Sequence, residues 1–107
     1  MSEHVLVWQF QVRPEHVAAF EAAYGPSGDW ARLFARADGY LGTELLRDAS
    51  SPGRYLTVDR WQTPADVARF RDVHGAEYAA LDARCEPWTV SETRLGAFET
   101  VTGADGC

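Results

Sequence analysis

The chain has 107 residues and a formal net charge of −6 at pH 7. Hydrophobic residues make up 46% of it and charged residues 24%, the profile of an ordinary soluble domain with a single core. The acidic balance argues against a nucleic acid or an anionic membrane as partner. No apolar run approaches the roughly 20 residues needed to span a bilayer.

Cysteine and histidine are too scattered to predict a metal or haem site. Cys85 and Cys107 share no metal or redox spacing, and His4, His16 and His74 show no ligand spacing. We therefore expect no metal, haem or other cofactor. The N-terminus has neither a basic start nor a cleavage site, so the sequence predicts a cytoplasmic protein with reduced thiols.

The first half of the sequence predicts two strands with helical segments between them. Residues 4–12 are rich in β-branched and aromatic residues and predict a strand. A helix begins at Pro14 and ends at the Gly-Pro pair at 25–26. A short helix around Trp30 follows, and residues 40–47 predict the second strand.

A hairpin connection at 50–53 leads to a third strand at 54–62. The alternation of this strand places four residues on one face: Tyr55, Thr57, Asp59 and Trp61. After a long helix, Pro87 ends the helical region and residues 88–98 predict the last strand.

The long helix at 64–85 has the clearest signals in the sequence. Thr63 is a plausible N-cap, Pro64 suits the first helical position, and Asp66 stands where a capping box places its acid. Spacings of three and four form one stripe of Val67, Phe70, His74, Tyr78, Leu81 and Cys85. Gly75 predicts a stop or a kink within this helix.

The order of elements is βαββαβ, which predicts an α+β fold: a ferredoxin-like antiparallel sheet with helices on one face. We expect a single domain over residues 1–107, with a frayed tail at about 101–107. Both strand parities carry apolar residues, and the strand aromatics are too many to leave exposed. A partner sheet, and hence a homodimer built sheet to sheet, is the simplest cover.

His74 is the most chemically suggestive residue, because it is a titratable side chain on an apolar stripe. These residues alone favour a structural interpretation of His74 over a catalytic one. In that interpretation His74 lies in the last turn before Gly75, where Asp72, Glu77 or free carbonyls satisfy it.

Four segments, GDWARLF, GYLGTELLRD, GRYLTVDRW and EYAALDARCE, resemble in order and spacing the antibiotic biosynthesis monooxygenase family of the dimeric α/β-barrel superfamily. The resemblance covers roughly residues 3 to 100. It implies a homodimer with a pocket between sheet and helices in each subunit. The best-known activity in that family is oxidation of aromatic polyketide intermediates by O₂ without metal, flavin or haem.

The resemblance leads us to expect a cofactor-independent monooxygenase acting on a small aromatic or enolisable compound. We assign His74 as proton acceptor, Tyr78 as hydrogen-bond donor to the oxyanion, and Trp61, Phe70 and Trp8 as walls of the substrate pocket. Because each pocket contact strengthens in a dry cavity, an aromatic pocket with few charges fits this chemistry.

Other interpretations stay open. Trp8 and Trp61 equally fit core or interface packing, Tyr78 can send its hydroxyl to the surface, and Asp59 either orients His74 or pairs across the sheet. The protein can be a non-catalytic dimeric binding or structural domain, or an isomerase of the same superfamily. The haem-degrading branch is disfavoured because the chain has no Asn and its long helix has no Trp.

Overall fold

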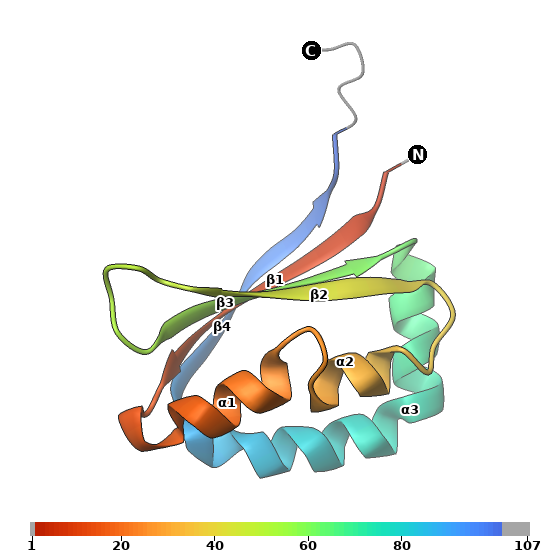
Figure 1. Ribbon diagram of the computed structural model, residues 1–107. Coiled ribbons are helices and arrows are strands. Elements are labelled where there is room, and N and C mark those ends of the chain that lie inside the picture. Colours follow the sequence, from red (N-terminus) through yellow and green to blue (C-terminus); the bar gives the residue numbers. More distant parts are fainter. Residues whose placement is uncertain (1, 102–107) are drawn as a thin grey trace.

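The computed structural model describes residues 2–101, and its elements follow the predicted βαββαβ order (Figure 1). The strands and helices are β1 (His4–Val12), α1 (Val17–Tyr24), α2 (Asp29–Phe34), β2 (Tyr40–Arg47), β3 (Arg54–Trp61), α3 (Pro64–Cys85) and β4 (Thr89–Glu99). Short 3₁₀ turns at Pro14–His16 and Glu86–Trp88 precede α1 and β4. The predicted α+β fold class is confirmed. Most of the expected frayed tail, residues 102–107, lies outside the described residues.

Within residues 2–101 the strands form one antiparallel sheet in the order β2-β3-β1-β4. The helices cover one face of this sheet (Figure 1). Register places Trp8 opposite Thr57 and His4 opposite Trp61, so the inward residues of β1 and β3 form one continuous surface. That surface is the floor on which the candidate site is built.

The aromatic side chains of β1 and β3 point toward the helices, where Phe10, Tyr55 and Trp61 are almost fully buried. Phe20 of α1 packs against Phe10 and Tyr55 with ring centroids 5.3 and 5.1 Å apart. The expectation that these strand aromatics need a partner sheet was therefore wrong, because the helices of the same chain cover them. The opposite face carries aliphatic side chains and one exposed phenylalanine, including Val7, Leu46, Leu56, Val58 and Phe98.

Helix α3 bends at His74, whose backbone leaves helical geometry at φ −115° and ψ 22°. The bend was predicted at Gly75, one residue later. The N-cap is as expected: the Thr63 hydroxyl accepts a hydrogen bond from the Asp66 backbone N–H at 3.2 Å. In Figure 1 the first limb of α3 descends from the end of β3, and the second limb runs beneath the sheet, where Tyr78 packs against Trp30 of α2. The bend thus holds the second limb across the inward sheet surface.

Among residues 2–101, none of the helices is both long enough and apolar enough to cross a membrane. The longest, α3, is amphipathic in its contacts: Phe70 and Cys85 are buried, while many of its other side chains face solvent.

Candidate functional site

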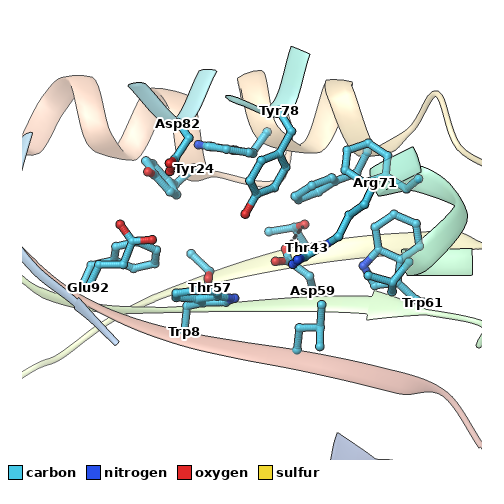
Figure 2. Close-up of a pocket in the computed structure, with 16 residues that line it drawn as sticks. Trp8, Tyr24, Thr43, Thr57, Asp59, Trp61, Arg71, Tyr78, Asp82 and Glu92 are labelled. Atoms are coloured by element: carbon cyan, nitrogen blue, oxygen red, sulfur yellow. Dashed lines mark hydrogen bonds between the residues drawn. The ribbon is translucent and has the colours of Figure 1, made fainter. Parts of the chain in front are cut away.

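A pocket lies between the second limb of α3 and the inward face of the sheet (Figure 2), with an empty volume of about 640 Å³ including its mouth. Its aromatic lining consists of Trp8, Phe10, Tyr24, Trp30, Phe34, Trp61, Phe70 and Tyr78. Its polar lining consists of Thr43, Thr57, Asp59, Arg71, Asp82 and Glu92.

Asp59 is a buried carboxyl group on the pocket floor. It is 9% exposed, and it accepts a hydrogen bond of 2.7 Å from the Thr43 hydroxyl. Sheet register sets this contact, because Thr43 of β2 is paired with Asp59 of β3. The Tyr40 hydroxyl lies 2.6 Å from the Thr43 oxygen and continues the chain. Burial raises the pKa of Asp59 to about 6, since one hydroxyl donor does not replace the water it lost.

Trp61 lies two residues from Asp59 on the same face of β3 and is 1% exposed. Its indole Nε1 is buried and has no hydrogen-bond partner within residues 2–101. Figure 2 shows this nitrogen on the pocket side of the ring. An unpaired buried donor lowers the stability of the fold by roughly 1–3 kcal/mol. A ligand oxygen can satisfy this donor.

Helix α3 contributes Arg71 before its bend and Tyr78 after it. The Arg71 guanidinium lies over the Tyr78 ring, 5.6 Å from the centroid. Burial raises the pKa of Tyr78, so its hydroxyl stays protonated at neutral pH and acts as a donor. In Figure 2 the Arg71 side chain extends from α3 toward the end of the pocket that holds Asp59 and Thr43.

The other end of the pocket is acidic. Asp82 projects from α3 and Glu92 from β4, on the far side of Tyr78 from Arg71 (Figure 2). Burial raises the pKa of Glu92, and the nearby carboxylates of Asp82 and Glu86 raise it further. The pocket is therefore aromatic in the middle, with Arg71 and the buried Asp59 toward one end and the carboxyl groups of Asp82 and Glu92 toward the other.

Four of the five residues assigned from the sequence line this pocket: Trp8, Trp61, Phe70 and Tyr78. The fifth, His74, is not among the described residues that line the pocket. The non-helical backbone at His74 breaks the three- and four-residue spacing that brings Phe70 and Tyr78 to the sheet.

His74 lies instead behind Phe70, with ring centroids 5.4 Å apart, and lines a second hollow near Arg36 and Arg69. Its Nδ1 is buried without a hydrogen-bond partner in the described chain, and the closest carboxylate oxygen, Glu77 Oε2, is 3.9 Å away. His74 therefore shares the second hollow with Phe70 and does not line the pocket of Trp8, Trp61 and Tyr78.

Sequence reasoning did not assign Arg71, Asp82 or Glu92 to the site, and it considered Asp59 only as a partner of His74 or of the sheet. The signal for Asp59 was present, because β3 alternation places it on one face with Trp61. A local signal for Arg71 and Asp82 was also present, because they follow Val67 and Tyr78 of the apolar stripe by four residues, which places them on the same side of the helix.

The sequence profile described as antibiotic biosynthesis monooxygenase matches residues 4–76 of this chain. The chain belongs to that family. The matched part of the family domain includes β1, β2, β3 and the first limb of α3, and with them Asp59, Trp61 and Arg71.

Solved structures of family type share the whole fold. A candidate antibiotic biosynthesis monooxygenase of Nitrosomonas europaea has a TM-score of 0.73 at 16% identity, over 94% of this chain and 91% of that one. One from Bordetella bronchiseptica gives 0.69 at 22% identity, over 95% and 98%. SnoaB, a cofactor-independent oxygenase from Streptomyces nogalater, gives 0.69 at 21% identity, over 95% and 96%. No curated protein matches the sequence.

Residues 2–101 hold no group of three or more His, Cys, Asp or Glu side chains placed to bind a metal ion. The polar groups that line the pocket are the buried Asp59 carboxyl, the carboxyls of Asp82 and Glu92, the unpaired indole N–H groups of Trp30 and Trp61, the phenols of Tyr24 and Tyr78, and the Arg71 guanidinium.

Proposed function

We propose that this protein is a cofactor-independent monooxygenase that oxidises a small aromatic or enolisable compound with O₂. Membership of the antibiotic biosynthesis monooxygenase family supports this, as does the shared fold of SnoaB, which is described as a cofactor-independent oxygenase. The observation that carries the proposal is the pair on β3: a buried carboxyl group and an unpaired indole N–H in one aromatic pocket.

Asp59 is the proton acceptor in this proposal. With a pKa of about 6 it is largely ionised at neutral pH, yet it is a stronger base than an ordinary aspartate. It removes a proton from a phenolic hydroxyl or from the carbon next to a carbonyl. Thr43 and Tyr40 hold the carboxylate in place through their hydrogen-bonded chain.

The resulting oxyanion needs donors that are already fixed in position. Trp61 Nε1, the Tyr78 hydroxyl and the Arg71 guanidinium supply them. Phe70 and Trp8 form walls that keep water out and strengthen these contacts.

The substrate anion itself supplies the electrons. Two electrons from the deprotonated carbon reduce O₂ and form a C–O bond, which gives a hydroperoxide on that carbon. Loss of the remaining C–H proton then breaks the O–O bond, so that one oxygen atom stays as a carbonyl, the other leaves as water, and the carbon has given four electrons in all. A CH₂ group and O₂ thus become C=O and H₂O, so no external reductant is required.

The assignment of His74 as the proton acceptor stays a prediction and competes with Asp59. Phe70 stands between His74 and the pocket, and this separation favours Asp59. His74 then acts on the site only through its position at the bend of α3.

The proposal includes a homodimer formed through the outer sheet face. Leu46 and Phe98 on that face are 47% and 51% exposed, and Leu56 and Val58 of β3 and Val7 of β1 lie between them. Burying such a continuous aliphatic surface against a second copy is favourable. Sedimentation that gives a monomer of 11.9 kDa at micromolar concentration would contradict this part.

Oxygen consumption with a panel of anthrones and hydroquinones tests the activity. Asp59→Asn removes the base and should lower kcat by roughly 10²–10⁴-fold on a substrate that the wild type accepts. His74→Phe keeps the ring volume and serves as the matched variant, with kcat expected within about threefold of wild type.

The reverse result, with Asp59→Asn active and His74→Phe inactive but folded, would replace Asp59 by His74 as the proton acceptor. Proton exchange into substrate without oxygen consumption would favour an isomerase, which needs the same base. Binding without either reaction would favour the non-catalytic binding domain.

A further inference from the structure

Strand β2 is irregular beside the pocket. Its register on β3 shifts between Tyr40 and Gly42, so Leu41 is the extra residue of a β-bulge. Gly42 has a φ of 141°, a backbone conformation that residues with a side chain rarely adopt. In a regular strand, residues three apart point to opposite faces, but this bulge puts Tyr40 and Thr43 on the same inward face. The bulge thus brings their two hydroxyl groups together.

The two hydroxyl groups and the Asp59 carboxylate form a hydrogen-bond chain with one direction. Thr43 has a single hydroxyl hydrogen, and it donates this hydrogen to Asp59 Oδ1 at 2.7 Å. In the 2.6 Å contact between Tyr40 and Thr43, the Tyr40 hydroxyl must then be the donor. Burial raises the pKa of Tyr40, so its hydroxyl keeps its hydrogen at neutral pH.

The Tyr40 ring is fixed by two buried aromatic side chains. Its centroid lies 5.6 Å from that of Phe34 and 5.3 Å from that of Trp61. Tyr40 is half-buried and is not among the described residues that line the pocket, whereas Thr43 and Asp59 do line it (Figure 2). Any effect of Tyr40 on a bound ligand must therefore pass through Thr43.

The two oxygens of the Asp59 carboxyl group have different surroundings. Oδ1 accepts the hydrogen bond from Thr43, whereas no residue in the range 2–101 donates a hydrogen bond to Oδ2. The Glu21 carboxylate beside the other end of β3 accepts three hydrogen bonds, from Tyr55 and from two nitrogens of Arg47. The chain at Asp59 instead satisfies one oxygen and leaves the other without a donor in a group that lines the pocket.

We propose that Tyr40 is a positioning residue, which holds the Thr43 hydrogen on Asp59 Oδ1 and so keeps Asp59 ionised, with Oδ2 as the oxygen that takes the substrate proton. In that step the substrate C–H or O–H bond breaks, its electron pair stays on the substrate, and an O–H bond forms at Oδ2. The proton transfer rests on the proposed function. The effect of Tyr40 on the ionisation of Asp59 does not.

The effect follows from which form of Asp59 the Thr43 hydroxyl can bind. A donor to the carboxylate favours the ionised form, and a hydroxyl that is free to rotate can instead accept a hydrogen bond from the protonated form. Tyr40 fixes Thr43 as a donor and so removes the second possibility. Burial already raises the pKa of Asp59 to about 6, so a further rise would leave much of it protonated near neutral pH. A protonated carboxyl group cannot accept the substrate proton.

Carbon NMR of isotope-labelled aspartate carboxyl groups measures the ionisation midpoint of Asp59 without a ligand, and the signal is assigned by its loss in Asp59→Asn. Tyr40→Phe removes the hydroxyl but keeps the ring, and should change the ionisation constant about threefold in favour of the protonated form. Thr43→Val removes the direct donor and should change it by about tenfold or more. Thr43→Ser keeps a hydroxyl and should stay within about twofold of wild type.

Tyr55→Phe is the matched control, because it removes a tyrosine hydroxyl from the same sheet at the Glu21 end. It should leave the ionisation midpoint of Asp59 unchanged. The other titratable groups that line the pocket are the same in all these variants: Arg71, Tyr78 and Asp82 of α3, Tyr24 of α1 and Glu92 of β4. A shift confined to the Tyr40 and Thr43 variants can then be assigned to the chain.

The pH profile of kcat separates positioning from general damage to the site. On a substrate that the wild type oxidises, Tyr40→Phe should lower kcat about two- to threefold on the acid side of the profile and restore it on the alkaline side. A loss of packing alone would lower kcat by the same factor at every pH.

An unchanged Asp59 midpoint in Tyr40→Phe, or an equal shift in Tyr55→Phe, would overturn the inference and leave the proposed function standing. If the midpoint shifts as expected but the wild type oxidises no substrate, the positioning role stands and the proposed function fails. Should Tyr40→Phe not fold, the wild type decides. Its Tyr40 and Thr43 hydroxyl protons should be visible in proton NMR with a cross-peak between them, and their absence would overturn the inference.

Discussion

The polar groups at the two ends of the inward face of β3 differ in how fully they are hydrogen-bonded. At one end the Tyr55 hydroxyl donates a hydrogen bond to Glu21, and the Arg47 guanidinium pairs with the same carboxylate at 2.7 Å. At the other end Asp59 has a single hydroxyl donor, and Trp61 Nε1 has no partner within residues 2–101. One strand thus carries a satisfied cluster and, four residues later, an unsatisfied one.

The pKa values of the two carboxyl groups record this difference. Hydrogen bonds from Tyr55 and Arg47 lower the pKa of Glu21, whereas burial raises that of Asp59 to about 6. Ionised Glu21 favours folding and ionised Asp59 opposes it. The comparison teaches that the same backbone surface can supply stability at one end and a reactive, less stable site at the other.

The largest expected effect on stability is that of Asp59→Asn. The folded-state pKa of about 6 lies above the unfolded value near 3.9, so the folded state holds the extra proton between about pH 4 and pH 6. The Asp59 contribution to the free energy of unfolding therefore falls as pH rises through that window, by up to about 3 kcal/mol.

Urea unfolding of wild type and Asp59→Asn at pH 4 and pH 7.5 measures this effect. The free energy of unfolding of the variant, relative to that of the wild type, should be higher at pH 7.5 than at pH 4, because the neutral amide has no ionisation to oppose folding. If the difference in free energy of unfolding between the two proteins is the same at both pH values, the pKa of Asp59 is not raised by burial in the folded protein.

A smaller effect of opposite sign is expected for Tyr55→Phe at the satisfied end. The variant loses a hydrogen bond to a charged acceptor and should be less stable by about 1–2 kcal/mol at pH 7. Because Glu21 has a lowered pKa, its contribution is present above the unfolded pKa and is lost as pH falls through the folded one. The cost of Tyr55→Phe should therefore be smaller at pH 3; a cost that is unchanged there would argue against the hydrogen bond.

The smallest stability effect is expected for Trp61→Phe. Lost ring packing destabilises the variant, but removal of an unsatisfied donor offsets much of that loss, so the net change should be below about 1 kcal/mol. Affinity for 2-naphthol should fall about tenfold, while affinity for naphthalene, which has no oxygen acceptor, should fall far less. An equal loss for both ligands would show that only packing was removed.

Much of the fold was predictable because its signals are local. Alternation placed β1 at His4–Val12 and β3 within one residue of its observed end, and the Thr63–Asp66 cap located the start of α3. The cover of the inward aromatics was not predictable, because alternation tells which residues share a face but not which face the helices occupy.

The site was predictable only in part. Trp61, Phe70 and Tyr78 were found from their periodic spacing, and they line the pocket. Helical spacing did not place His74, because its own backbone leaves helical geometry at φ −115° and ψ 22°. The pKa of Asp59 depends on how closely α2 and α3 cover it, and that distance is not contained in the β3 sequence.

The bend of α3 lies between residues that line the same pocket. Arg71 precedes His74, whereas Tyr78 and Asp82 follow it, so the angle between the two limbs sets the spacing between the guanidinium and the acidic end. The surroundings of Gly75 are open, with nothing within 4 Å of a Cβ at that position. Substitutions at His74 and Gly75 can thus change the angle of the bend, and with it the length of ligand that the pocket binds. The residues that contact the ligand need not change.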